Sequence, residues 1–369
     1  MSQILTVSSV LASIGSILVA LLILLAMITI HEFGHYIAGK LLKFKINEFS
    51  IGFGPAIFKK KNEKTGEQFS VRVIPLGGYC AFDGEEEETE SETSFVKQKP
   101  WKRIIVLVAG AFMNYVLAMI LILTSFFAYG QYLYVTYEVE PSETAAVYSF
   151  HDKDIIYECE GRDVYLVSDI VKGIRGKSEG DLVEFTVSRL EGEERKVQKV
   201  EIMLRADTTS LNSASNDEIW TALGIAKNDE GAWQMFVTPT RLGFFETIGR
   251  SFVYSFRVAG SIFQALGELI TGAIGLNAMG GPITTITMTS QIATRSFRSF
   301  LEISSYIGVN LAVFNLLPIP ALDGSKVIFT AIEWVRGKPV NRKVEAIIHT
   351  AGLLLIFGFA ILVDILQWL

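Results

Sequence analysis

A long uncharged stretch at residues 5–30 constrains this chain more than any other feature of its sequence. About 20 apolar residues in a helix cross the hydrocarbon core of a bilayer, so this stretch is long enough to span a membrane. No positively charged segment precedes it and no small-residue cleavage site closes it, which favours a retained span over a signal peptide. Three further apolar blocks follow, at residues 104–129, 300–317 and 346–363. The sequence therefore predicts an α-helical polytopic membrane protein with four transmembrane helices.

The composition of the 369-residue chain agrees with this prediction. Hydrophobic residues make up 50% of the chain and charged residues 20%, whereas soluble domains have about 25% charged residues. The net charge of −6 gives no electrostatic reason to bind nucleic acid. The expected partners are therefore the lipid bilayer and proteins within it. Two cysteines, Cys80 and Cys159, are too few for a disulfide framework.

Lysine and arginine gather on one side of the predicted spans, and this bias sets the orientation. They fill the connection between the first and second blocks and the connection between the third and fourth. Both connections are therefore expected in the cytoplasm, with both termini and residues 130–299 outside. Arg295 and Arg298 stand at the outer end of the third block, but long segments translocate largely regardless of their charge.

The long outer segment begins with a polar, β-rich region. Strand-like runs lie at 132–139, 154–160, 182–190 and 196–204, with a helix expected at 167–174 and turns at Gly161, Gly176 and Gly192. The order of a strand, a short turn, a helix and a strand ending in arginine resembles a PDZ domain, which binds extended chains at a sheet edge. A small β-rich spacer is the alternative.

Residues 241–263 form a different element, with six large apolar residues on one side of a helical wheel and charged residues on the other. The apolar side comprises Phe244, Phe245, Ile248, Phe252, Phe256 and Phe263. This pattern is typical of a helix that lies in the membrane interface. A helix packed on the outer domain is the alternative.

The main candidate for chemistry is His31-Glu32-Phe33-Gly34-His35 at the end of the first span. The pattern H-E-x-x-H places two histidines one helical turn apart, where they can share a metal ion, and places a glutamate beside them as a general base. Ionisable residues at this depth are unfavourable in lipid, so their presence indicates function. A histidine pair that merely reaches the membrane surface is the alternative.

A catalytic zinc needs a third protein ligand and an open position. Asp323 is the better candidate, because Pro318 and Pro320 break the third span near the depth of the histidines. The freed backbone then needs a polar environment. His349, at the start of the fourth span, is not excluded as the third ligand. An ordinary helix-ending loop with a capping aspartate is the reading that this segment would have without the histidines.

Together, H-E-x-x-H in the first span and N-x-x-P-x-P-x-L-D-G at 315–324 resemble the site-2 protease family of intramembrane zinc metalloproteases. Residues 50–55 (SIGFGP) and 74–79 (IPLGGY) are similar to the membrane-associated β-hairpin of its RseP-like bacterial branch. Residues 110–114 (GAFMN) are close to the family's GPxxN, with Ala111 in place of proline. A single PDZ-like insert matches the shorter members of that branch.

The resemblance implies a fold, a site and a location. One Zn²⁺ per chain would be held by His31, His35 and Asp323, with Glu32 as the proton carrier. Asn315 and Asn310 would contact the substrate backbone, and the hairpin at Gly52, Phe53 and Gly54 would receive the unwound substrate. Substrates would be transmembrane segments, such as those of anti-sigma factors or signal-peptide remnants, cut in regulated intramembrane proteolysis. The location would be the bacterial cytoplasmic membrane, with the site near the cytoplasmic face.

The implied division of the chain has seven parts. They are a first span with HExxH (1–40), a membrane-associated hairpin with a cytoplasmic loop (41–100), a second span (101–130), a PDZ-like extracytoplasmic domain (131–235), an amphipathic interfacial region (236–296), a third span with LDG (297–325), and a cytoplasmic loop with the fourth span (326–369). Two other functions stay open: a zinc-bound PDZ membrane receptor without turnover and, less favoured, a solute transporter. Glu32 argues for the protease, because a structural zinc does not need a general base.

Overall fold

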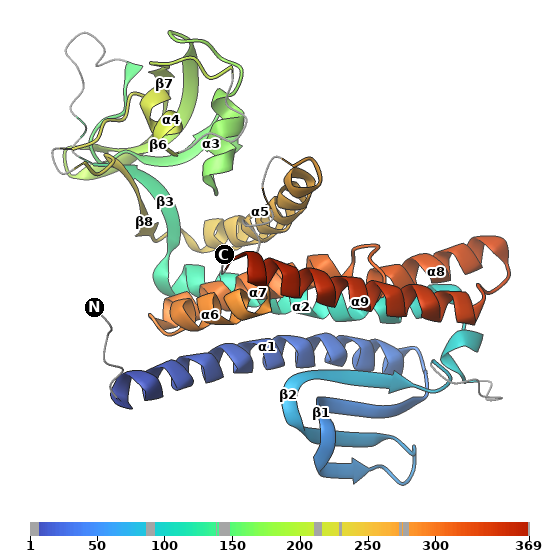
Figure 1. Cartoon of the computed structure of the whole chain (residues 1–369). Helices are drawn as coiled ribbons and strands as arrows, with labels where there is room; N and C mark the ends of the chain where they lie inside the picture. The colour runs from blue at the N-terminus through green and yellow to red at the C-terminus, as the bar shows by residue number, and fades with distance from the viewer. Residues whose placement is uncertain are drawn as a thin grey trace. The chain divides into compact units, whose positions relative to one another are not determined.

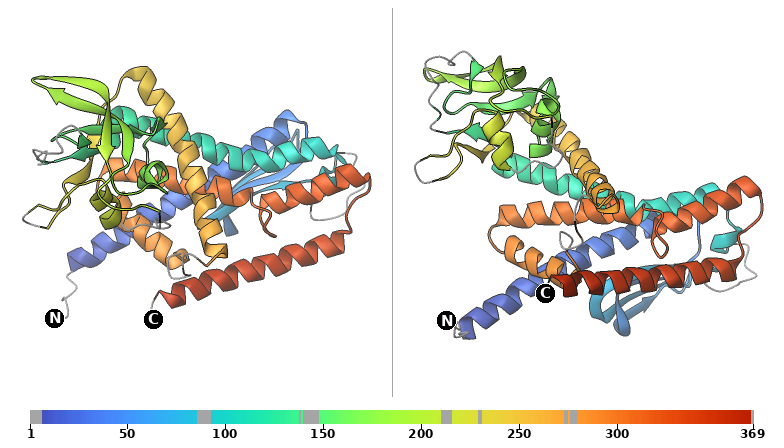
Figure 2. Two further views of the ribbon diagram at one scale, coloured as in Figure 1. Left: turned by 90° about the horizontal axis from the view of Figure 1, so that it is seen from above. Right: turned by 45° about the horizontal axis from the view of Figure 1, so that its top comes forward.

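The computed structural model describes residues 7–85, 93–137, 139, 148–209, 216–228, 231–272, 275 and 280–367. Contacts divide the chain into two compact units, Met1–Ser125 with Ser251–Leu369, and Phe126–Arg250. Figures 1 and 2 show that the first unit is built mainly of long helices with one β-sheet, and the second mainly of strands. We call them the helical unit and the insert.

Long apolar helices dominate the helical unit. They are α1 (Val7–Leu41), α2 (Pro100–Tyr129), α5 (Phe244–Ile270, of which Ser251 onward belongs here), α6 (Pro282–Ala293), α7 (Phe297–Asn315), α8 (Asp323–Arg336) and α9 (Arg342–Leu366). A short 3₁₀ helix, η1 (Phe95–Lys97), precedes α2. Prolines at the first turns of α2 and α6 fit positions where their missing N–H is not needed. Between α8 and α9, Gly337 takes a left-handed conformation that ends α8.

Three helices in the described part of the chain are long and apolar enough to cross a membrane: Ser13–Leu41, Pro100–Tyr129 and Arg342–Leu366. These correspond to the first, second and fourth predicted spans, although residues 5 and 6 lie outside the described residues. The third predicted span is the helix α7, which is shorter and carries Arg298 and Glu302 in its first turns. The segment that follows Asp323, expected as a loop, contains the helix α8.

The strands β1 (Ile46–Lys61) and β2 (Gln68–Phe82) form a separate sheet that packs beside α1. Each strand pairs twice. The start of β1 pairs with the end of β2, as in Phe49 with Cys80, and also with the start of β2, as in Phe49 with Phe69. The strands therefore bend back on themselves. Gly52 and Gly54 supply the bend in β1 with φ angles of 86° and 81°, which side chains other than glycine rarely allow.

The insert contains an antiparallel sheet in the order β7-β6-β4-β3-β8, with β5 paired to β4. Its elements are β3 (Gln131–Thr136), β4 (Ile155–Cys159), β5 (Arg162–Asp163), α3 (Val167–Ile174), β6 (Leu182–Glu191), β7 (Glu194–Met203), α4 (Asn216–Ala222) and β8 (Met235–Thr240). The four predicted strands and the predicted helix are confirmed to within a few residues. The sequence reading did not identify β5, β8 or α4. Ile156, Phe185 and Ile202 form part of a fully buried core.

The helix predicted at 241–263 is confirmed as α5, and its apolar side is exposed. Phe252, Phe256 and Phe263 are each about half exposed. On the opposite side, Arg250 is buried in the insert, where it donates to the Gln131 side chain, the Asp163 carboxylate and the Val164 carbonyl. Arg250, near the start of α5, is thus part of the packing of the insert, whereas Phe252, Phe256 and Phe263 present apolar surface.

Candidate metal centre and active site

Two histidines and one aspartate converge on a single point in the helical unit. His31 and His35 lie one turn apart on α1, and their Nε2 atoms are 3.1 Å apart. Asp323, the first residue of α8, places Oδ2 2.9 Å from Nε2 of His31 and 3.3 Å from Nε2 of His35. Zinc bonds of about 2.0–2.1 Å at tetrahedral angles put the donor atoms about 3.3 Å apart. The three atoms are therefore arranged as three ligands of one small cation would be.

Hydrogen bonding around His35 supports a cation at this point. Its Nδ1 lies 2.8 Å from the Val106 carbonyl oxygen, which can only accept, so Nδ1 carries the hydrogen. The Nε2 atom of a neutral His35 then offers a lone pair toward a second imidazole and a carboxylate. Electron-rich atoms at such distances repel one another unless a proton or a metal cation lies among them. Orientation of a ligating histidine by a backbone carbonyl is common in metal sites.

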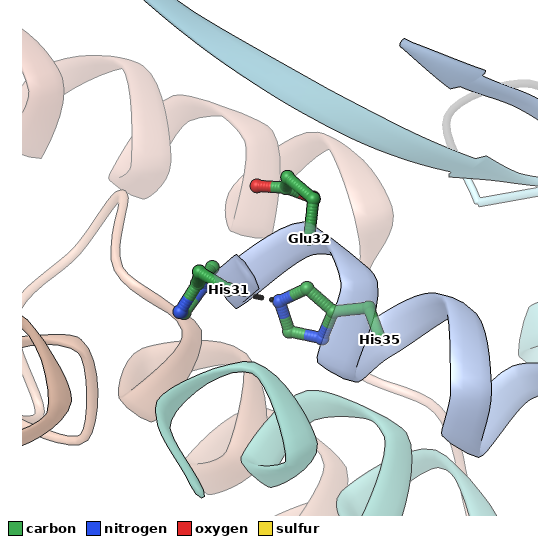
Figure 3. A group of neighbouring side chains, drawn as sticks. All are labelled: His31, Glu32 and His35. Atoms are coloured by element: carbon green, nitrogen blue, oxygen red, sulfur yellow. Dashed lines mark hydrogen bonds between the residues drawn. The ribbon is translucent and has the colours of Figure 1, made fainter. Parts of the chain in front are cut away.

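Glu32 belongs to the same cluster but faces another direction. Its carboxylate lies close to both imidazoles, and its Oε2 accepts a 3.1 Å hydrogen bond from the Cys80 backbone N–H of β2. Figure 3 shows the imidazoles on the side of α1 that faces α2, whereas Glu32 points toward the strands. The carboxylate is thus held beside the cluster with one oxygen bound to β2, and no described residue donates a hydrogen bond to the other oxygen.

Small residues let α2 approach the cluster. A Cβ atom on Gly110 would lie 2.5 Å from His35 Nε2 and 2.8 Å from His31 Cε1. On α1, Gly34, the residue before His35, has the Ala109 carbonyl against it so closely that no side chain would fit. The imidazoles therefore rest directly on the backbone of α2. GAFMN was noted in the sequence only as a motif, and this packing role of its glycine was not foreseen.

The loop that precedes Asp323 is fixed in place by contacts with α9. The N–H of Ala321 donates to His349 Nδ1 at 3.0 Å, and Pro320 packs against Gly352 without room for a side chain there. Ala321 has a φ of 78°, an uncommon conformation for a residue with a side chain. His349, the alternative third ligand, therefore lies against the loop, and Asp323 rather than His349 meets the histidine pair.

Two pockets meet at Glu32 and Asp323. The hairpin-side pocket, about 660 Å³, is lined by these two residues and, among others, by Asn47, Phe53, Tyr79, Cys80, Glu85 and Lys326. The helix-side pocket, about 290 Å³, is lined by these two residues and by Ile28, His31, Asn114, Leu311, Asn315, Ala321 and Leu322. One pocket is bordered by β-strands and charged groups, and the other by helices.

The predicted substrate-binding residues are not all brought to the cluster. Asn315 lines the helix-side pocket and Phe53 lines the hairpin-side pocket. Asn310 instead donates to the Tyr306 carbonyl of its own helix. Gly52 and Gly54 form the bend of β1, and Gly54 O accepts a hydrogen bond from Arg72.

The strand nearest the cluster is β2 rather than β1. Its end, which includes Gly78 and Cys80, pairs with β1 on one side, and on the other side the N–H of Cys80 meets Glu32. No further described strand pairs with this side of β2. A sheet edge with backbone groups facing the site was not visible from the sequence.

Two histidines and an aspartate arranged in this way, with the histidines on a long apolar helix, are typical of a membrane zinc peptidase of the HExxH class, and comparison with known proteins agrees. The family model of peptidase family M50 matches residues 19–359. The Clostridium perfringens protein "Putative zinc metalloprotease CPE1693" is 30% identical over 356 residues, which cover 95% of this chain and 97% of that protein. FN1322 of Fusobacterium nucleatum, which has the same description, is 29% identical over 358 residues, 94% of this chain and 97% of its own length.

The chain therefore belongs to peptidase family M50, the site-2 proteases. It is an intramembrane zinc metalloprotease, as the sequence predicted. This assignment favours the protease over the silent receptor and the transporter.

Proposed function

We propose that His31, His35 and Asp323 are the zinc ligands and that Glu32 is the general base and acid. The observation that carries this proposal is the meeting of Nε2, Nε2 and Oδ2 within 2.9–3.3 Å of one another. The carbonyl of Val106 fixes the His35 ring, and the His349 and Gly352 contacts fix the loop of Asp323. When bound, zinc supplies a Lewis acid that polarises the scissile carbonyl and acidifies water.

The protein's own groups then handle the proton. Glu32 takes a proton from the attacking water and later returns it to the leaving amine. The Cys80 N–H keeps the carboxylate in place during both transfers. The hairpin-side pocket, with Lys326 and Glu85 paired at 2.8 Å, provides a polar space beside Glu32 through which water arrives.

The substrate class follows from the same surroundings. Peptide groups of a transmembrane helix are hidden in its own hydrogen bonds, so the segment must be extended before cleavage. The free side of β2 offers backbone groups to which an extended chain can add. Asn315 faces the other pocket, where it can bind the same chain. We infer that the substrates are transmembrane segments of membrane proteins, with anti-sigma factors and signal-peptide remnants as the expected types.

The location and the finer domain plan complete the proposal. Charge asymmetry supports four spans, including α7, with the site near the cytoplasmic face of a bacterial inner membrane and both termini outside. The antiparallel sheet of the insert, together with its helices α3 and α4, supports a PDZ-like domain outside the membrane. The exposed phenylalanine side of α5 supports a helix that rests in the membrane interface.

The deciding experiment compares the unsubstituted protein with Glu32→Gln. The variant should keep zinc, because Glu32 is not a proposed ligand, and should cleave a transmembrane reporter roughly 10²–10⁴-fold more slowly. Glu63→Gln, an exposed glutamate on the hairpin, is the matched control and should cleave normally. Near-normal cleavage by Glu32→Gln would contradict the proposed role.

A further inference from the structure

Asn114, in the middle of α2, is fully buried, and the mechanism above gives it no role. Neither its Oδ1 nor its Nδ2 has a hydrogen-bond partner within the described part of the chain. A primary amide offers two donors and an acceptor. Leaving all of them unpaired among apolar helices is unfavourable, so a buried amide of this kind calls for an explanation.

The position of Asn114 on α2 explains why its amide is left unpaired. Val106, Gly110 and Asn114 follow one another at intervals of four residues, so they share one face of α2. On that face, Val106 binds His35 and Gly110 touches both imidazoles. Asn114 comes one turn further and lines the helix-side pocket together with Glu32, Asp323 and Asn315.

We infer that Asn114 binds the backbone of the extended substrate, with Oδ1 accepting from a peptide N–H and Nδ2 donating to a peptide carbonyl. The inference rests on the proposed function, because the ligand is the unwound transmembrane segment. The carboxylates that line this pocket, those of Glu32 and Asp323, can only accept hydrogen bonds when ionised, whereas the side-chain amides of Asn114 and Asn315 offer both a donor and an acceptor. An amide side chain can hydrogen-bond to both the N–H and the carbonyl of a peptide group without contacting the substrate's side chains. Recognition by Asn114 therefore tolerates many apolar sequences and requires an intact peptide group.

The test measures binding of a fluorescent transmembrane peptide to the zinc-loaded, full-length Glu32→Gln protein, which does not consume it. Asn114→Leu removes the amide and keeps a similar volume. Zinc content should be unchanged, and the melting temperature should be unchanged or raised, because an unpaired buried amide is lost. The peptide should bind roughly tenfold more weakly, as expected for about one net hydrogen bond. Ser125→Ala is the matched control. Ser125 is on the same helix, buried, with Oγ unpaired among the described residues, and is absent from the pocket lining. This variant should bind the peptide normally.

A backbone scan separates contact from packing. Peptides in which one amide at a time is replaced by an ester lose a single N–H. At one position the ester should weaken binding of the peptide to the protein that carries Glu32→Gln alone, which we call the parent. The same ester should have little further effect on binding to Asn114→Leu, because the effects of removing two interacting partners are not additive. Equal binding of the peptide by the parent and Asn114→Leu would overturn the inference.

Two further outcomes are also decisive. If Asn114→Leu does not fold, the ester scan on Asn114→Ala, which also lacks the amide, decides in its place. Identical scans for Asn114→Ala and for the protein that carries Glu32→Gln alone would assign Asn114 to packing only. If the parent Glu32→Gln protein binds no transmembrane peptide, the proposed function fails and this inference fails with it.

Discussion

The site joins two regions that are built in opposite ways. His31 and His35 lie on the uninterrupted helix α1, so the helical period alone brings them together. Asp323 follows a break in the chain after α7, and its loop depends on contacts with α9. One half of the site is thus set by local structure, and the other half by tertiary packing. Substitutions near the histidines and substitutions near the loop of Asp323 should therefore lower zinc affinity to different extents.

The largest effect is expected from the proposed ligands themselves. His35→Ala and Asp323→Ala should each weaken zinc binding by more than the roughly 10–100-fold that follows loss of an outer-shell partner. Metal analysis of the purified proteins measures this. His151→Ala, which changes a histidine of the insert, is the control and should keep full zinc. Full zinc occupancy in Asp323→Ala would move the third ligand elsewhere, with His349 tested first.

Gly110→Ala tests the helical half from the side of α2. The added methyl would meet both imidazoles, so the rings must shift and zinc affinity should fall about 10–100-fold. Gly358→Ala on α9, where a methyl group meets open space, should bind zinc normally. Unchanged affinity in Gly110→Ala would show that α1 and α2 can separate without disturbing the histidines.

His349→Ala tests the packed half. The Ala321 N–H loses its partner, and the strained loop can relax away from the histidines. Zinc affinity should fall by no more than about tenfold, because the ligand itself remains. His349→Asn keeps an acceptor near the position of Nδ1 and should restore most of the affinity. If His349→Ala and the unsubstituted protein bind zinc equally, α9 does not position Asp323.

The smallest effect is expected from the bend of β1, which lies outside both halves. Arg72 donates to Ser50, Gly54, Glu48 and Tyr79 across this bend. Arg72→Met should leave zinc binding intact and slow cleavage about fivefold, the equivalent of about one net hydrogen bond. Cleavage slowed as strongly as in Glu32→Gln would place Arg72 in the chemistry instead.

The same bend should also be sensitive to acid. Burial would raise the pKa of Glu48, but hydrogen bonds from Ser70 and Arg72 outweigh it and lower the pKa to about 2. A lowered carboxyl pKa stabilises the folded state above the usual pKa of glutamate, and that stabilisation is lost as the pH falls toward 2. Limited proteolysis across this range should cut the hairpin of Arg72→Met at a higher pH than that of the unsubstituted protein.

The histidine half of the site could be predicted from the sequence more fully than the Asp323 half. The reason is that helical geometry is local, whereas the loop of Asp323 depends on tertiary contacts. HEFGH needs only helical geometry, and the structure places its two histidines one turn apart and in contact, as expected. For Asp323 the sequence offered only the break at Pro318 and Pro320, which favoured Asp323 without excluding His349, because the contacts that place its loop join residues far apart in the chain. The two asparagines could have been separated, since five residues turn a helix by about 140° and both cannot face one pocket. The edge of β2 beside Glu32 could not be read from the sequence, because it results from strands that bend and pair twice.

The close approach of α1 and α2 also restricts how a substrate enters. At Gly34 and Ala109 the two backbones touch, so a polypeptide cannot pass between these helices without first prising them apart at the level of the histidines. A lateral gate on that side would disrupt the metal centre each time it opened. Under the proposed function, we therefore expect a substrate to enter from the lipid along another flank of α1, where the free edge of β2 lies and where movement leaves the histidines in place.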